Sequence, residues 1–488
     1  MLTTCDVYRS FMVLAIASTG ACGSSDPSDD RFAAVADAVR KDLATSNATA
    51  ASIAVWLDGE VVYVGGFGHA DPQGTAAPDD RTEFMIGSDT KKLTAIQMLR
   101  EVAQGKTSLD ARVGDLLPEL HMALAPEFED TTVRQLLSHQ SGIMDGTENT
   151  ATTTDAALAS FAYGEFAASY YALSPPGQFF NYSNPNYSIA GLIEERLEGR
   201  PWADIVEHDV FAPLGMTRTV ARKAEVDGNR ALGRGPTVTG TAIQPVSFDD
   251  TWESAFVRPA GLVWSTPGDQ MRLAAFLVDG NPAVLDDAAR RELSTSQVAL
   301  YPELTVGYGM GLFVDRGVSL GGAFYDVPVW YHGGNTNTHT STFYVLPEQR
   351  FAISILSNGY GDNFTATVVA AMVALADLPA PSTPPVHPFD PSKLDGLTGT
   401  YVDPHGLGDI VVTRQGDALA VTIPALDATG DSYQHALTAV TTRLWLATIG
   451  GAPVEVSFLD GPEGTEYLRT RSVVAVRARP GAAAPAQP

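Results

Sequence analysis

The chain has 488 residues, of which 44% are hydrophobic and 18% are charged. This composition is typical of a globular protein and excludes a disordered one, and the length predicts two folded domains. The formal net charge of −26 argues against nucleic-acid binding, which requires lysine and arginine to neutralise phosphates. It is typical of a solvated acidic surface.

The first residues have the pattern of an export signal. A short apolar run at 11–17 follows Arg9, and small residues lead from it to Cys22. The run is too short to remain as a membrane-spanning helix. Residues 1–22 are similar to a bacterial lipoprotein signal, with Cys22 as the acylated first residue of the mature chain. The alternative is a plain secretory signal that leaves a free cysteine. We therefore expect an exported protein, either a periplasmic or cell-envelope lipoprotein that meets membrane only through this lipid anchor, or a secreted protein.

The globular part begins with a helix and a hairpin. Apolar residues at three- and four-residue steps over 32–43 predict an amphipathic helix. Two strand-like runs follow, at 52–57 and 61–64, and the dipeptide Asp58-Gly59 between them favours a type I′ turn. We therefore expect the sheet to begin before the first segment that is a candidate for catalysis.

That candidate is the segment 84–95, which turns at Gly87 and is predicted to open into a helix with Ser88 at its start. Residues three apart share a helix face, so Ser88 and Lys91 can bring a hydroxyl and an amine together at the helix N-terminus, where backbone N–H groups point outward. Such a unit offers a nucleophile, a base and an oxyanion donor. The same spacing also fits a serine cap followed by a surface lysine. Apolar residues up to Gly105 predict a helix with a buried stripe.

His139 lies near the end of a second helical pattern, at 132–143. It is a candidate for a Ser-His-Asp triad. Nothing else in the chain completes such a set, and a histidine at a helix end more often caps carbonyls or fills a core position. A structural role is therefore favoured.

Tyr182 and Asn184 lie in a polar turn that precedes an apolar helical pattern at 189–197. The phenol of Tyr182 can pass protons if a nearby ammonium lowers its pKa, and the amide of Asn184 can orient both a lysine and a substrate carbonyl. Tyrosine and asparagine are also frequent in turns for conformational reasons. The pair is a candidate that needs support from its context.

A strand-like run meets His332, Gly333 and Gly334 before Asn335. Glycine inside a strand lets a ligand approach the backbone closely, and the following N–H, that of Asn335, can point at an oxyanion. The alternative is a β-bulge with a surface histidine. This segment is thus a third candidate for one wall of a catalytic cleft.

Three motifs occur in order along the chain: Ser-x-x-Lys at 88–91, Tyr-x-Asn at 182–184 and His-x-Gly at 332–334. On these motifs the chain resembles the serine β-lactamase and penicillin-binding protein superfamily, and within it the class C-type branch of D,D-peptidases, esterases and related hydrolases. Flanking sequences support the resemblance: Phe-Met-Ile-Gly-Ser at 84–88, Leu-Leu-Ser-His-Gln-Ser-Gly at 136–142, Phe-Ala-Pro-Leu-Gly-Met-Thr at 211–217 and Ala-Gly-Leu-Val-Trp-Ser-Thr-Pro-Gly-Asp at 260–269.

The resemblance implies an α/β fold over residues 31–378, in which an antiparallel sheet is flanked by helices and a helical domain is inserted between its strands. It implies that Ser88 attacks a carbonyl, that Lys91 and Tyr182 share the proton transfers, and that N–H groups hold the oxyanion. No metal or organic cofactor is implied. The residues that would bind or position the substrate are Asn184, His332, Gly333, Gly334 and Asn335.

One departure bears on the substrate. His332-Gly333-Gly334 stands where many β-lactamases carry Lys-Thr-Gly, and a neutral histidine is a weaker partner for a substrate carboxylate than a lysine. Efficient β-lactam hydrolysis is therefore not expected. The chain is predicted to be an exported serine hydrolase of a small-molecule or peptide amide or ester: a D,D-carboxypeptidase or peptidase, an esterase or a weak β-lactamase. The alternative is a penicillin-binding or sensor protein that is acylated without efficient turnover.

A rival nucleophile lies at Ser319, because residues 317–321 match the Gly-x-Ser-x-Gly elbow of another hydrolase fold. That elbow requires a helix directly after the serine. The residues that follow, 323–330, have a strand-like composition. Ser319 is therefore predicted to lie in a loop between two strands, and Ser88 is preferred.

The composition changes after residue 378. Residues 379–392 are rich in proline and predict a semi-rigid linker. Short strand-like runs over 393–479 predict a small antiparallel β-barrel or sandwich, which resembles the lipocalin-like C-terminal module of some of these hydrolases. It contains no catalytic constellation, so packing or partner recognition is expected. Residues 480–488 are predicted to be a disordered tail.

Overall fold

The computed structural model describes residues 27–71, 74, 77–146, 152–236, 242–430, 432–461 and 464–478. The predicted signal peptide with Cys22 and the predicted tail lie outside these residues. Within the described ranges, no helix is both long and apolar enough to cross a membrane.

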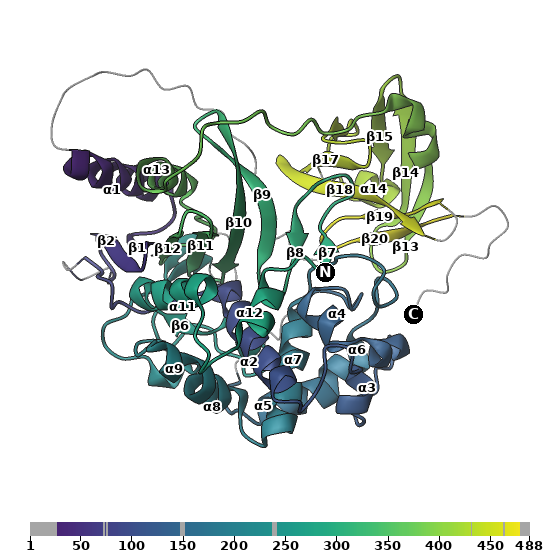
Figure 1. The fold of residues 1–488 in the computed structure, drawn as a ribbon. Coiled ribbons are helices and arrows are strands. Elements are labelled where there is room, and N and C mark those ends of the chain that lie inside the picture. Colours follow the sequence, from purple (N-terminus) through teal and green to yellow (C-terminus); the bar gives the residue numbers. More distant parts are fainter. Residues whose placement is uncertain are drawn as a thin grey trace.

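An antiparallel sheet with the strand order β2-β1-β12-β11-β10-β9-β8-β7 forms the centre of the larger domain (Figure 1). The predicted hairpin is confirmed, because β1 pairs with β2 and both Asp58 and Gly59 have positive φ angles, 50° and 99°. The strands are β1 (Ala50–Leu57), β2 (Glu60–Gly68), β7 (Val298–Ala299), β8 (Gly307–Tyr308), β9 (Phe313–Leu320), β10 (Ala323–Asn335), β11 (Thr340–Leu346) and β12 (Phe351–Ser357).

Successive side chains of β1 point to opposite faces of this sheet and enter two separate cores. Ile53 and Val55 belong to the core beneath α1 (Pro27–Thr45) and α13 (Thr365–Leu375), which lie side by side in Figure 1. Ala54 and Trp56 belong to the larger core, which contains α11 (Pro267–Asp279). The predicted arrangement of a sheet flanked by helices is confirmed.

The chain between β2 and β7 forms a helical region inserted between strands of the sheet, as predicted. Two short strand pairs accompany its helices, β3 (Phe84–Met85) with β6 (Trp264–Ser265) and β4 (Arg234–Pro236) with β5 (Ile243–Pro245). The other helices here are α2 (Lys91–Ala103), α3 (Val113–Leu116), α4 (Val133–Leu137), α5 (Ala157–Phe161), α6 (Ala167–Ser169), α7 (Asn184–Glu198), α8 (Trp202–Val206), α9 (Ala212–Leu214), α10 (Arg258–Gly261) and α12 (Asp287–Leu293).

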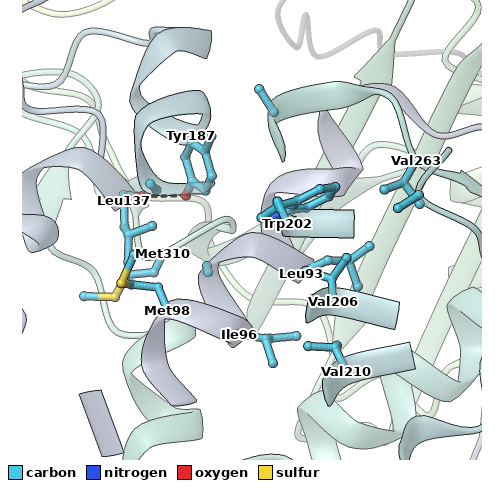
Figure 2. Packing of buried hydrophobic residues seen from close by; sticks show 14 of the residues in the cluster. Leu93, Ile96, Met98, Leu137, Tyr187, Trp202, Val206, Val210, Val263 and Met310 are labelled. Atoms are coloured by element: carbon cyan, nitrogen blue, oxygen red, sulfur yellow. Dashed lines mark hydrogen bonds between the residues drawn. The ribbon is translucent and has the colours of Figure 1, made fainter. Parts of the chain in front are cut away.

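Helix α2 runs through the middle of the larger core. Figure 2 shows its residues Leu93 and Ile96 facing Val206 and Val210 of the helical region. The sequence predicted one buried stripe on this helix, but nearly all of its residues are buried, including lysine, threonine and glutamate. Because α2 has neighbours on every side, its polar residues must find partners within the protein.

The C-terminal residues form a second antiparallel sheet that curls into a nearly closed barrel of strand order β15-β14-β13-β20-β19-β18-β17-β16. The last gap is bridged by backbone hydrogen bonds from Val421 to His435 (2.8 Å) and from Leu437 to Leu419 (2.9 Å). The prediction of a small antiparallel module is confirmed. Its elements are β13 (Gly399–Asp403), β14 (Gly408–Gln415), β15 (Ala418–Thr422), α14 (Pro424–Thr429), β16 (Thr438–Ala439), β17 (Leu444–Ile449), β18 (Ala452–Gly461), β19 (Gly464–Arg469) and β20 (Val474–Arg477).

The barrel packs against the helical region through an apolar contact. Leu173 and Phe179 of the helical region form one buried cluster with Tyr467 and Val474 of the barrel. The rings of Phe179 and Tyr467 meet edge to face with their centroids 5.2 Å apart. The segment that precedes α7 is therefore covered by β19 and β20.

Candidate active site

Ser88 lies in a single 3-10 turn, Gly87–Thr90, that leads from β3 into α2. Gly87 has a φ of 54°, a left-handed conformation that favours glycine. A Cβ atom on Gly87 would lie 2.6 Å from the backbone nitrogen of Asn335 and 2.8 Å from the Cα of Gly334. The turn can therefore press against the end of β10 only with glycine at this position. Ser88 is half-buried, whereas both of its neighbours in the turn are buried.

Lys91 contacts the Ser88 hydroxyl, with 3.1 Å between Nζ and Oγ. The same amine donates hydrogen bonds to Oδ1 of Asn184 and to the carbonyl oxygen of Ala260, both at 2.7 Å. The predicted pairing of a hydroxyl and an amine thus occurs, although Ser88 lies in the turn before α2 rather than in the helix itself. The lysine is wholly buried and is not a surface residue.

Burial lowers the pKa of Lys91 well below its ordinary value. Asp145 and Asp89 oppose this shift, while Arg471 acts in the same direction as burial. A lysine whose ammonium form is disfavoured can be present as the neutral amine. A neutral amine next to a serine hydroxyl is a base in position to take its proton.

Tyr182 lies beside this amine, with Nζ of Lys91 4.9 Å from the centroid of its ring. His139 also contacts this ring and stacks on it with 4.1 Å between centroids. Nδ1 of His139 accepts the backbone N–H of Ser183 at 3.1 Å. Burial lowers the pKa of His139 well below its ordinary value, so the ring is neutral. His139 therefore supports Tyr182 and its loop, and the residues that the structure describes form no Ser-His-Asp triad around it.

Asn184 is the first residue of α7, so this helix begins five residues earlier than the apolar pattern indicated. Proline at position 185 suits the first turn of a helix. The backbone N–H and the Nδ2 of Asn184 both donate to Oδ1 of Asp145, at 2.8 and 3.0 Å. These two bonds orient the amide so that its oxygen faces Lys91.

His332, Gly333, Gly334 and Asn335 end β10 and pair with β11. The ring of His332 is buried, with Nδ1 2.6 Å from the carbonyl oxygen of Gly333 and Nε2 3.1 Å from the hydroxyl of Tyr308. A carbonyl can only accept, so Nδ1 carries the proton and Nε2 accepts one from the tyrosine. Burial lowers the pKa of His332 well below its ordinary value. The alternative of a surface histidine is wrong. The two hydrogen bonds of the ring hold the end of β10 in place.

Asp145 and Arg471 belong to this site although neither stood out in the sequence. Nη2 of Arg471 lies 3.0 Å from Oδ2 of Asp145, and its guanidinium carbon lies 4.4 Å from the ring centroid of Tyr182. Arg471 comes from the turn between β19 and β20, in the barrel. The module without a catalytic motif thus contributes a side chain to the site. No local pattern could have marked it, because its place depends on how the barrel packs.

The rival Ser319 is part of β9 and pairs with Phe324 of β10. It was predicted to lie in a loop, but the connection between the two strands is only residues 321–322. A strand follows the serine, so the strand-to-helix geometry of a nucleophile elbow is missing. Among the residues that the structure describes, no group of three or more histidine, cysteine, aspartate or glutamate side chains is arranged to hold a metal ion.

Comparison with known proteins adds three findings. The Beta-lactamase family matches residues 35–378. "Penicillin-binding protein 4" of Amycolatopsis lactamdurans is 30% identical over 360 residues, which are 72% of this chain and 92% of that protein. Among solved structures, SurE is similar with a TM-score of 0.68 at 23% identity, over 93% of this chain and 99% of SurE. A D-stereospecific amidohydrolase from Streptomyces sp. has a TM-score of 0.58 at 25% identity, over 70% of this chain and 99% of its own.

Proposed function

The chain belongs to the β-lactamase family of serine hydrolases, as its three motifs predicted, and we propose that it hydrolyses an amide or ester through an acyl-enzyme on Ser88. The observation that carries this proposal is the 3.1 Å contact between Oγ of Ser88 and Nζ of Lys91. Burial gives this lysine the lowered pKa that a base requires. The partial exposure of Ser88 supports the access of a substrate carbonyl to its hydroxyl.

In the proposed reaction, the neutral amine of Lys91 takes the hydroxyl proton while Oγ of Ser88 bonds to the carbonyl carbon. The carbonyl oxygen becomes an oxyanion and is held by the backbone N–H groups of Ser88 and Asn335. Tyr182 passes a proton to the leaving nitrogen or oxygen as its bond to carbon breaks. Lys91 returns the serine proton to Tyr182. Water then attacks the acyl-enzyme and gives a proton to the Lys91–Tyr182 pair, and this pair protonates Oγ of Ser88 as its bond to the acyl carbon breaks and the acid is released.

For the substrate, we propose a small peptide with a D-amino acid at the scissile bond. The similarity to a penicillin-binding protein and to a D-stereospecific amidohydrolase supports this choice. The neutral ring of His332 supports the expectation of poor β-lactam hydrolysis, because it supplies no charge for the β-lactam carboxylate. We also propose export, with a lipid anchor on Cys22, on the pattern of residues 1–22.

The experiment presents purified protein with a p-nitrophenyl ester, a chromogenic cephalosporin and an acyl-D-Ala-D-Ala peptide. We expect turnover of the peptide and the ester, and a loss of more than about 1,000-fold in Ser88→Ala. Tyr182→Phe should slow acyl transfer sharply, and wild-type rates in that variant would contradict its role. Failure to hydrolyse any of the three substrates contradicts the enzyme proposal. A Ser88 adduct that persists for hours without further product would instead indicate the sensor function.

A further inference from the structure

The turn between β19 and β20, residues 470–473, brings the barrel to the catalytic residues. Arg469, at the end of β19, anchors it: Nη2 donates to the carbonyl oxygen of Leu300 at 2.7 Å, and Nη1 donates to the carbonyl oxygen of Phe180. Arg469 is almost fully buried. Because Phe180 lies two residues before Tyr182, this anchor fixes the turn against the catalytic loop.

Arg471 follows two residues later and is linked to the nucleophile by polar contacts. Its Nη2 lies 3.0 Å from Asp145, and Asp145 accepts the side-chain amide of Asn184 at 3.0 Å. Asn184 accepts from Lys91 at 2.7 Å, and Lys91 lies 3.1 Å from the hydroxyl of Ser88. The guanidinium therefore has a defined place relative to the reacting atoms.

The charges around the site differ in their access to a substrate. Lys91 and Lys92 are wholly buried, and Lys92 forms an ion pair with a buried aspartate at 2.7 Å. The imidazoles of His139 and His332 are buried and have lowered pKa values, so they carry no charge at neutral pH. The side chain of Arg471, in contrast, is 33% exposed. Of these five groups, Arg471 is the charged one whose side chain is partly exposed.

We propose that Arg471 binds a carboxylate of the substrate, so that the C-terminal barrel completes the active site of the hydrolase domain. This inference rests on the proposed function and deepens it, because it identifies the substrate class as peptides with a free C-terminal carboxylate. A guanidinium presents several N–H donors in a planar fork that matches a carboxylate, so it can hold the substrate and Asp145 together. A local cation also favours the approach of an anionic substrate to a chain with a net charge of −26.

The test compares two substrates that differ only in charge, an acyl-D-Ala-D-Ala peptide and its C-terminal amide. We expect the wild type to prefer the free acid. Arg471→Ala should lower kcat/KM for the acid by about 10- to 100-fold relative to the amide, and Arg471→Lys should retain part of the preference. Any effect of Arg471 on Lys91 changes kcat/KM for both substrates alike, so it cancels in the ratio of the two kcat/KM values. Arg414→Ala is the matched control, because Arg414 lies on the same barrel and pairs with Asp395.

Equal hydrolysis of the acid and the amide by the wild type would overturn the inference, as would an unchanged ratio in Arg471→Ala. Binding measured by calorimetry gives an answer without turnover. The acid should bind about tenfold or more weakly to Ser88→Ala/Arg471→Ala than to Ser88→Ala, and equal dissociation constants contradict the inference. Failure of the proposed function has a different signature, because then neither the p-nitrophenyl ester nor the peptides are hydrolysed and no Ser88 adduct forms. Arg471→Lys keeps the charge and serves as the second variant if Arg471→Ala does not fold.

Discussion

Arg469→Met tests how firmly the barrel supports the catalytic loop. Arg469 is 5% exposed, and its side chain donates hydrogen bonds to the backbone carbonyls of Phe180 and Leu300. Methionine fills a similar volume but carries no donor, so both carbonyls lose a partner. A buried acceptor left unpaired costs about 1 to 3 kcal/mol, which gives about 2 to 6 kcal/mol for the pair.

Part of this loss of stability is offset. Burial lowers the pKa of Arg469, because the charged form is disfavoured there, and methionine removes this desolvation. We therefore expect the free energy of unfolding to fall by about 2 kcal/mol, at the lower end of the range. Because Phe180 lies two residues before Tyr182, we also expect kcat for the p-nitrophenyl ester to fall severalfold.

Urea denaturation followed by circular dichroism, together with ester kinetics, measures both effects. Arg477→Met is the matched control, because Arg477 donates to carbonyl oxygens of Gly396 and Thr398 within the barrel region. It should lower stability and leave kcat unchanged. The reasoning is refuted if Arg469→Met keeps both its stability and its kcat, or if Arg477→Met lowers kcat to the same extent.

Three further outcomes are expected. The acylation rate should rise with pH through the lowered pKa of Lys91, because the ammonium form that is present below that pKa cannot take a proton. A rise that begins only near the ordinary lysine pKa of 10.5 would contradict this prediction. Gly87→Ala should abolish hydrolysis, because the new Cβ would collide with the backbone nitrogen of Asn335. Gly105 is the matched control, because it also has a positive φ, 73°, but has open space around it. Gly105→Ala should lower the free energy of unfolding by only about 1 kcal/mol and leave the activity unchanged. Ser319→Ala should keep nearly full esterase activity, and a loss comparable to that of the nucleophile variant would reverse the assignment.

The parts of the fold that the sequence predicted depend on neighbours along the chain. Asp58 and Gly59 have the positive φ angles that their turn signal indicated. Ser88 and Lys91 meet because their spacing brings them to one side of a turn, whatever surrounds it. The short strand-like runs of the C-terminal residues likewise predicted an antiparallel module without any knowledge of its closure.

The features that the sequence did not predict depend on packing between distant segments. Asp145 carries no motif, and its role follows from the two hydrogen bonds that it accepts from Asn184. Arg471 reaches the site only because the barrel packs on the loop of Tyr182. His332 could be read as a surface residue, but its ring is buried and its Nε2 accepts a hydrogen bond from the hydroxyl of Tyr308. Such contacts leave no periodic signal in one sequence.

Mass spectrometry of the acyl-enzyme tests the central claim most directly. The protein is exposed briefly to a p-nitrophenyl ester, quenched in acid and digested, and the acylated peptide is identified. The account predicts an adduct of the acyl mass on the peptide that contains Ser88, and none in Ser88→Ala. An adduct on another residue, or full hydrolysis by Ser88→Ala, would contradict it.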